Sequence, residues 1–169
     1  TAYRGDGNQD YMRFNVATTF TRAAEEALID VESSIHVGAR GPTNDSGVFN
    51  HTRDVGYGLI DSTELFNAGL RNTAKNIVES LKGRSVYLCF DMDFFDPSCA
   101  PGVCTPTWGG ATSREGLDFL QNLTGLNLVG ADINTVSPPH DISGMTAFLA
   151  ATVGLEILSV ICHSKGLVE

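Results

Sequence analysis

The strongest constraint on the fold is an alternation of short apolar runs with longer helical patterns. Residues 86–90 (VYLCF) form a continuous apolar run, which is typical of a strand buried on both faces. Residues 126–129 start a second such strand, and the helical pattern between the two begins with capping-box spacing at Thr112 and Glu115. Because parallel strands need a crossover helix, this order predicts an α/β fold with a mainly parallel sheet and helices on both faces.

The rest of the chain follows the same alternation. Asp61 and Glu64 have capping-box spacing at the start of one long helical pattern, and Gly83 ends it. No repeat or linker divides the sequence, so residues 1–169 are expected to form a single domain. The other expected elements are a helix over 19–28, a strand over 34–39, a weak helix over 46–56, a strand over 57–60, the long helix over 61–81 and a final helix over 143–162.

Charge and composition exclude several classes of partner. The chain has 11 Lys and Arg against 20 Asp and Glu, and the net charge of −9 repels phosphate backbones and anionic lipid. We therefore expect neither a nucleic acid nor a membrane as partner. The apolar stretch 145–162 is interrupted by polar and small residues, which predicts that it falls short of a membrane span. No signal-peptide pattern opens the chain, so a cytoplasmic location is expected, with an organelle left open.

The candidate chemistry lies at the end of the run 86–90. On an extended chain, Asp91 and Asp93 project to one side while Met92 points away. Two anions this close are unfavourable unless one is protonated or a cation lies between them. Strand ends of open parallel sheets are also where such folds bind ligands, and oxygen donors suit manganese or magnesium. The alternative is an aspartate-rich loop with a purely structural role.

Other polar residues have structural interpretations beside the functional ones. Asp96 precedes Pro97 at a turn and is expected to set the loop. Asp132 is either a site residue or a strand-end carboxylate held by hydrogen bonds. His36 lies in an apolar strand pattern and is expected to be a satisfied core or interface histidine. The four cysteines lack metal-finger spacing and are expected to be free thiols.

Two longer segments, 90–110 (FDMDFFDPSCAPGVCTPTWGG) and 129–141 (VGADINTVSPPHD), resemble the signature segments of the ureohydrolase family, which includes arginase and agmatinase. The family pattern is a strand ending in DxDxxDP, then APGTGTP with a double glycine, and later a strand ending in DxxExxP. Weaker likenesses cover nearly the whole chain, and the agmatinase-like branch is closer. The resemblance implies an arginase-like three-layer α/β sandwich, of which this chain is the C-terminal portion without the first strands.

The resemblance also implies roles for individual residues. Asp91 and Asp93 would be the metal ligands and catalytic residues of a binuclear manganese site, with nickel as the alternative ion. The metal pair would activate a water for attack on the carbon of a small guanidino substrate (agmatine, a guanidino acid or guanidine), and urea would leave. Asn134, Thr135 and His140 would contact the substrate. The family further implies a homo-oligomer, either a trimer or a hexamer.

Three departures from the family pattern point to an altered substrate or to lost activity. Thr135 stands where the family has a glutamate that pairs with the guanidinium, and a neutral hydroxyl gives no charge-assisted pair. Residues 15–18 (NVAT) replace a Ser-His-Gly-Thr-like segment, and the family's Asp-Ala-His-x-Asp strand is not in the sequence. The missing glutamate fits a very small substrate such as guanidine. The alternative is a catalytically inactive subunit that regulates or scaffolds a true enzyme.

Overall fold

The structure is a computed structural model that describes residues 1–5, 10–43 and 47–167. It divides into two compact units, Thr1–Glu64 and Leu65–Glu169. The expectation of a single domain over the whole chain stays a prediction.

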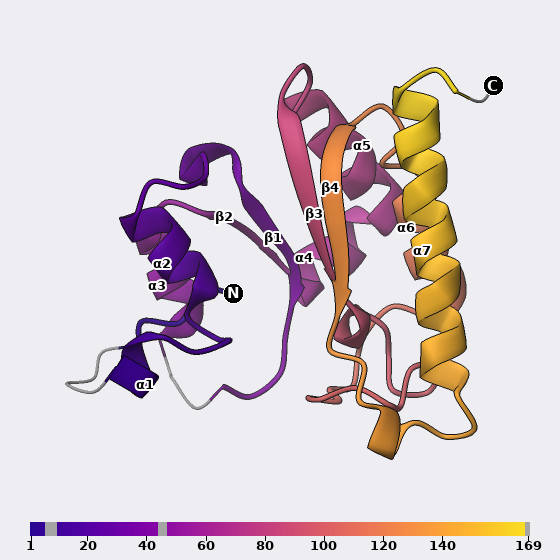
Figure 1. The fold of residues 1–169 in the computed structure, drawn as a ribbon, viewed down its shortest axis with the longest axis horizontal. Helices are drawn as coiled ribbons and strands as arrows, with labels where there is room; N and C mark the ends of the chain where they lie inside the picture. The colour runs from indigo at the N-terminus through magenta and orange to yellow at the C-terminus, as the bar shows by residue number, and fades with distance from the viewer. Residues whose placement is uncertain (6–9, 44–46, 168–169) are drawn as a thin grey trace. The chain divides into compact units, whose positions relative to one another are not determined.

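The first unit contains a two-stranded parallel sheet. β1 (Ile35–Ala39) pairs with β2 (Gly58–Asp61), and the register places His36 opposite Leu59. α3 (Val48–Val55) lies between them in sequence and contacts β2, as expected of a crossover helix (Figure 1). The remaining short helices of this unit are α1 (Asp10–Arg13), α2 (Thr19–Glu25) and the 3₁₀ turn η1 (Val31–Ser33).

The second unit contains a second parallel pair, β3 (Ser85–Asp91) and β4 (Asn127–Asn134), which lie side by side in Figure 1. α6 (Ser113–Gln121) connects the two strands, and α7 (Met145–Ser164) packs against β4 and α6. The predicted parallel pairing with helical crossovers is therefore present. The other helices of the chain are α4 (Ser62–Ala68), α5 (Leu70–Ser80) and the 3₁₀ turns η2 (Met92–Phe94) and η3 (Pro138–His140).

Both predicted capping boxes form. The Glu115 N–H donates to Thr112 Oγ1 (3.2 Å), and the Thr112 N–H donates to Glu115 Oε2 (2.9 Å). The same exchange joins Asp61 and Glu64, with distances of 3.1 Å and 2.9 Å. Each box satisfies backbone donors that a helix start leaves without intrahelical partners, so α4 and α6 begin where the sequence predicts.

The helix predicted over 61–81 is two helices, so the prediction of one long helix is wrong. Gly69 lies between α4 and α5 with a φ of 83°. This left-handed conformation is incompatible with a continuing right-handed helix, and glycine adopts it without the steric penalty of other residues. A single glycine inside a helical pattern is often tolerated, which is why the apolar spacing alone does not reveal the break.

The prediction that β3 is buried on both faces is also wrong. Burial alternates along the strand: Tyr87 is 61% exposed, whereas Phe90 is 5% exposed. Side chains of successive strand residues point to opposite faces, and Tyr87 and Cys89 share the exposed one. The run 86–90 looks continuously apolar because tyrosine and cysteine are counted as apolar residues. The tyrosine hydroxyl and the cysteine thiol nevertheless allow both side chains to face water.

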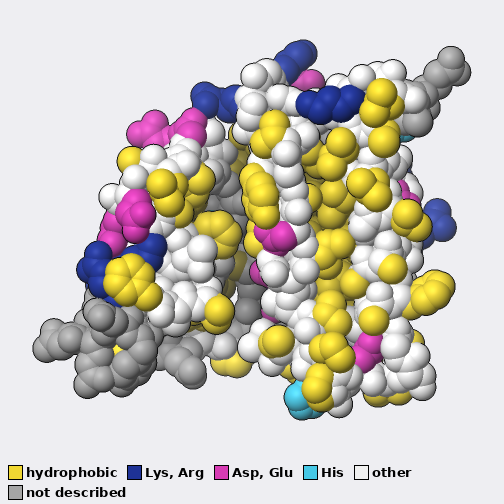
Figure 2. Space-filling view, viewed as in Figure 1, with side chains coloured by type: hydrophobic (Ala, Val, Ile, Leu, Met, Phe, Trp, Pro, Cys, Tyr) yellow, Lys and Arg dark blue, Asp and Glu magenta, His cyan; other side chains and the backbone are white. Residues whose placement is uncertain are grey.

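α7 buries one side and exposes the other. Val153, Ile157 and Val160 are at most 4% exposed, whereas Phe148 and Leu155 are 80% and 68% exposed. Figure 2 shows hydrophobic side chains gathered along this helix. By length and composition α7 also suffices to cross a membrane, so the prediction that it falls short is wrong on those criteria. Core helices of globular proteins pass the same test but are mostly buried, whereas 22% of the apolar stretch of α7 is buried, on the side that packs against β4 and α6.

Candidate metal and substrate site

The predicted site residues gather where β3 and β4 end. Asp91 is the last residue of β3, and it pairs in register with Asn134, the last residue of β4. Thr135 follows directly. Because the strands are parallel, their carboxyl ends meet at one edge of the sheet, which is the usual place for a ligand in such folds. Three of the predicted residues are therefore brought together from two distant parts of the sequence.

The chain is not extended through Asp93, so the geometric basis of that prediction is wrong. β3 ends at Asp91, and residues Met92–Phe94 form the 3₁₀ turn η2. Met92 nevertheless turns away from the aspartates into the core, where it is 0% exposed. Asp93 also stays close enough for its charge to act on Asp91. A tight turn after the strand thus keeps the two carboxylates near each other.

The electrostatics of Asp91 favour a cation. Although Asp91 is an exposed residue, surrounding protein atoms desolvate its carboxyl and raise its pKa above the ordinary value. The negative charges of Asp93 and Asp132 raise this pKa further. A divalent cation would reverse that effect, because it stabilises the charged form of each carboxylate.

The donor chemistry fits part of a manganese site. Carboxylate oxygens are hard donors of the kind that manganese and magnesium accept. Within residues 1–5, 10–43 and 47–167, no group of three or more His, Cys, Asp or Glu side chains is placed to hold an ion. Asp91 and Asp93 can therefore supply two carboxylates to a metal site but not a complete set of ligands.

Two threonines hold Asp93 in place. The Asp93 N–H donates to Thr135 Oγ1 at 3.3 Å, and Thr105 Oγ1 donates to Asp93 Oδ2 at 3.0 Å. Thr135 was expected to contact substrate, and its hydroxyl oxygen here faces the backbone of Asp93. Thr105 was not predicted. It lies twelve residues after Asp93 on a loop, and no local sequence signal indicates that its hydroxyl reaches back.

Thr135 has an unusual backbone conformation. Its φ is 68°, in the left-handed region that β-branched residues rarely adopt. The Thr135 carbonyl accepts a hydrogen bond from the Cys104 N–H at 3.0 Å, which ties this turn to the loop that carries Thr105. Strained backbone of this kind clusters at functional sites, where the surrounding structure enforces it.

Asp132 is held by hydrogen bonds. The Tyr87 hydroxyl donates to Asp132 Oδ2 at 2.6 Å, and the side-chain amide of Asn134 donates to Asp132 Oδ1. The bond to Asp132 also raises the pKa of Tyr87. These contacts fit the structural interpretation of Asp132, but its charge also acts on Asp91, so both interpretations stay predictions. The contacts also engage the amide of Asn134, which was predicted to contact substrate.

His140 lies on the segment after β4. It ends the turn η3, is exposed, and has its Nδ1 atom 2.7 Å from Ser137 Oγ. The structure therefore places this residue on an exposed loop of the second unit, where its ring is oriented by Ser137. Its role as a substrate contact stays a prediction.

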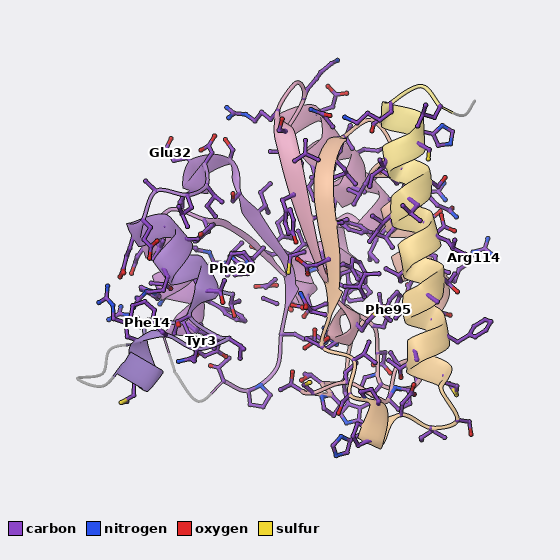
Figure 3. The ribbon with its side chains drawn as sticks, in the orientation of Figure 1. Tyr3, Phe14, Phe20, Glu32, Phe95 and Arg114 are labelled. Carbon is purple, nitrogen blue, oxygen red and sulfur yellow. The ribbon has the colours of Figure 1, made fainter. Side chains whose placement is uncertain are left out.

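His36 belongs to the first unit, where it packs between two aromatic rings. The ring centroids of Phe20 and Tyr57 each lie 4.9 Å from that of His36, and Figure 3 labels Phe20. His36 Nε2 is buried without a hydrogen-bond partner, so the expectation of a satisfied histidine is wrong. Burial lowers the pKa of His36 to about 3, because the apolar surroundings disfavour the charged ring.

Asp96 sets the loop that follows η2, as predicted. Its carboxylate accepts hydrogen bonds from the backbone N–H groups of Ser98 (2.9 Å), Gly109 (2.9 Å) and Gly110 (3.3 Å). These bonds, led by those from Ser98, lower the pKa of Asp96. The loop between them carries Thr105, so Asp96 helps to fix the path of the chain around the aspartate pair.

The cysteines of the second unit form no disulfide among themselves. All four cysteines of the chain are free thiols, as predicted. Burial raises the pKa of Cys99 on this loop, which keeps the thiol protonated and poorly nucleophilic.

Comparison with known proteins gives a consistent match. A family model described as the arginase family matches residues 5–159. The chain is 36% identical over 144 residues to guanidinobutyrase of Pseudomonas aeruginosa, covering 85% of this chain and 45% of that protein. The solved proclavaminate amidino hydrolase of Streptomyces clavuligerus superimposes with a TM-score of 0.83 and 36% identity, over 90% of this chain and 50% of that one.

A hypothetical agmatinase from Burkholderia thailandensis superimposes with a TM-score of 0.81 and 34% identity, over 95% of this chain and 48% of that one. The predicted arginase-like α/β fold is confirmed by these superpositions. The chain spans about half the length of the relatives that it matches, which agrees with the expectation that it holds only part of the family's fold.

Proposed function

Because the chain belongs to the arginase family, we propose that it is part of a metal-dependent amidinohydrolase that hydrolyses a small guanidino compound and releases urea. The observation that carries this proposal is the meeting of Asp91, Asp93 and Thr135 at the shared end of β3 and β4. The names of the matched relatives, guanidinobutyrase and agmatinase, support a guanidino substrate.

Each residue of the site has a distinct task in this proposal. Asp91 and Asp93 hold the ions, manganese first and nickel as the alternative. When bound, the ions supply Lewis acidity and an activated water. Thr105 and Thr135 keep Asp93 at the end of the strand through its carboxylate and its backbone. Asn134, next to Thr135, and His140, on the following loop, complete the proposed substrate contacts.

The side chain of Thr135 favours a small substrate. A carboxylate can bind a guanidinium through two charge-assisted hydrogen bonds, whereas a hydroxyl provides at most one neutral contact. A substrate whose binding depends on that carboxylate would be held weakly here. A very small substrate needs no further pocket for a distal amine, so we propose guanidine or a short guanidino acid ahead of agmatine.

An inactive subunit that regulates or scaffolds a true enzyme is the second candidate function. The observation that favours it is the neutral Thr135 beside Asp93, because a hydroxyl cannot form the charge-assisted pair that a carboxylate gives to a guanidinium. Such a subunit would have no need to retain a pair of ions.

The test is a urea-release assay on the full-length protein, loaded with manganese or nickel, with agmatine, 4-guanidinobutyrate and guanidine as substrates. We expect urea from at least one substrate and a pair of ions per chain by elemental analysis. Asp91→Ala should lose both, whereas Asp54→Ala, which removes an exposed carboxylate on α3, should lose neither. A pair of ions in Asp91→Ala would refute the site, and a wild type with neither ions nor urea would favour the inactive subunit.

We further propose that the protein forms a homo-oligomer, a trimer or hexamer, in the cytoplasm. The exposed apolar side chains of α7, such as Phe148 and Leu155, support self-association because patches of this kind mark interaction sites. Light scattering on the full-length protein would measure the oligomeric state.

A further inference from the structure

The carboxylate of Asp93 is oriented by a hydroxyl group from a separate loop. Thr105 Oγ1 donates a hydrogen bond to Asp93 Oδ2 at 3.0 Å. Thr135 also bonds to Asp93, but it accepts from the backbone N–H and so fixes the main chain rather than the side chain. Of these two threonines, Thr105 is therefore the one that acts on the rotamer of the carboxylate.

Backbone hydrogen bonds fix the loop residues just before Thr105 to two different elements. The Gly102 N–H donates to Thr146 Oγ1 at 2.8 Å, and Thr146 is 0% exposed at the start of α7. The Cys104 N–H, next to Thr105, donates to the Thr135 carbonyl at 3.0 Å. The hydroxyl of Thr105 thus extends from a backbone that α7 and the end of β4 hold in place.

The same loop pairs with the segment that follows β4. Val103 forms an isolated antiparallel bridge with Val136 and is 3% exposed. The Ser137 N–H donates to the Gly102 carbonyl at 2.8 Å. These contacts are made within the chain and restrict the loop, and a restricted loop positions the side chains that it supports.

We propose that Thr105 is a positioning residue for Asp93 and sets the affinity of the site for a divalent cation. This inference rests on the proposed function, in which Asp93 is a metal ligand. The hydroxyl donates to one carboxylate oxygen and limits the rotation of the side chain, so less conformational freedom is lost when an ion binds. Loss of a hydrogen-bonding partner of a metal ligand typically weakens metal binding about 10-fold to 100-fold.

The experiment is a manganese titration of the metal-free full-length protein by isothermal calorimetry, with free manganese followed by electron paramagnetic resonance. Thr105→Val keeps the shape of the side chain and removes the hydroxyl, and we expect it to weaken manganese binding about 10-fold to 100-fold. Thr105→Ser restores the hydroxyl and should bind within about threefold of the wild type. Thr105 is exposed, so these changes leave the core intact.

Thr124→Val is the matched control, since it removes the hydroxyl of an exposed threonine before β4 whose Oγ1 bonds to the Gln121 carbonyl. It should leave manganese binding unchanged. Thr105→Ala gives a second hydroxyl-free variant should Thr105→Val fail to fold, and thermal melting checks each protein.

The outcomes separate this inference from the proposed function. A wild type that binds no manganese overturns both. A wild type that binds manganese, with Thr105→Val and Thr105→Ala binding equally well, overturns the role of Thr105 and leaves the proposed function standing. Weakening in Thr105→Ser as large as that in Thr105→Val would also overturn it, because the hydroxyl would then not be the cause.

Discussion

At the residue scale, Thr135 should decide the substrate preference of the site. A glutamate at this position could form two charge-assisted hydrogen bonds to a guanidinium, each of about 1.5–3 kcal/mol. We expect Thr135→Glu to strengthen agmatine binding about tenfold for each ~1.4 kcal/mol gained. Activity on guanidine should fall, since the longer side chain would fill space beside Asp93 that so small a cation needs. The measurement is kcat and KM for urea release from both compounds.

Thr135→Val serves as the control for that experiment. It retains the β-branched shape and removes the Oγ1 acceptor of the Asp93 N–H, so it isolates the effect of losing that bond. If Thr135→Glu and Thr135→Val lose activity on every substrate alike, the hydroxyl acts through Asp93 rather than on the substrate.

His36 gives the first unit a dependence of stability on pH. Its pKa is lowered to about 3 in the folded chain by burial, whereas the unfolded chain has the ordinary value of 6.5. Below pH 6.5 the unfolded form binds a proton that the folded form does not, so the free energy of unfolding falls as the pH decreases toward 3. The slope approaches about 1.36 kcal/mol per pH unit for this group.

His36→Phe should remove this slope while keeping the ring contacts with Phe20 and Tyr57. Chemical denaturation at pH 7 and pH 5 gives the change in the free energy of unfolding for the wild type and for the variant. The carboxylates contribute equally to both proteins, so the difference between the two changes is due to His36. An equal loss of stability in both proteins between these pH values would contradict the assignment.

At the scale of single elements, α6 depends on a glycine for its packing. A Cβ atom at Gly116 would overlap the ring of Phe95, which is 1% exposed. Figure 3 labels Phe95 just beyond the ends of β3 and β4, where it packs on Phe90 and Phe94. The helix face and the loop after η2 therefore meet only because this position lacks a side chain.

Gly116→Ala should lower the free energy of unfolding by about 1–3 kcal/mol, because the methyl group overpacks the core. Helix propensity alone predicts the opposite, a gain of about 1 kcal/mol. Urea denaturation distinguishes the two. Arg114→Ala, at an exposed position of the same helix, should change stability by less than about 0.5 kcal/mol, and a stabilised Gly116→Ala would show that Phe95 moves freely.

At the scale of the whole molecule, unpaired edges and apolar surface favour association. The described strands form two sheets of two strands each, β1 with β2 and β3 with β4. Both strands of such a sheet have an edge open to further pairing, and exposed edges invite contact with other chains. Phe148, Leu155 and Leu158 on α7 add apolar surface that is at least 57% exposed.

We therefore expect residues 1–169, expressed alone, to associate in a concentration-dependent way. We also expect them to release no urea from agmatine, 4-guanidinobutyrate or guanidine. Size-exclusion chromatography with light scattering over a range of concentrations measures the association. A monodisperse monomer that unfolds cooperatively and releases urea would contradict this expectation.

The sequence alone determined the local features. Capping boxes at Asp61 and Thr112 formed as predicted, because they depend on hydrogen bonds between residues three apart. The order of strands and helices followed from periodicity, and so did the position of Asp91 at the end of a parallel strand. The arginase-like fold was also evident from the sequence, since the motifs around the aspartates occur in the same order as in the family pattern over a long segment.

Only the tertiary structure decided which side chains meet across long separations. The contact of Thr105 with Asp93, that of Tyr87 with Asp132 and the bond from Cys104 to Thr135 depend on the path of whole loops. The break at Gly69 and the turn after Asp91 likewise replaced a locally plausible helix and an extended strand. A periodic pattern in the sequence shows which face of a helix or strand is apolar. It does not show how the elements pack against one another in space, and that packing decides which side chains meet.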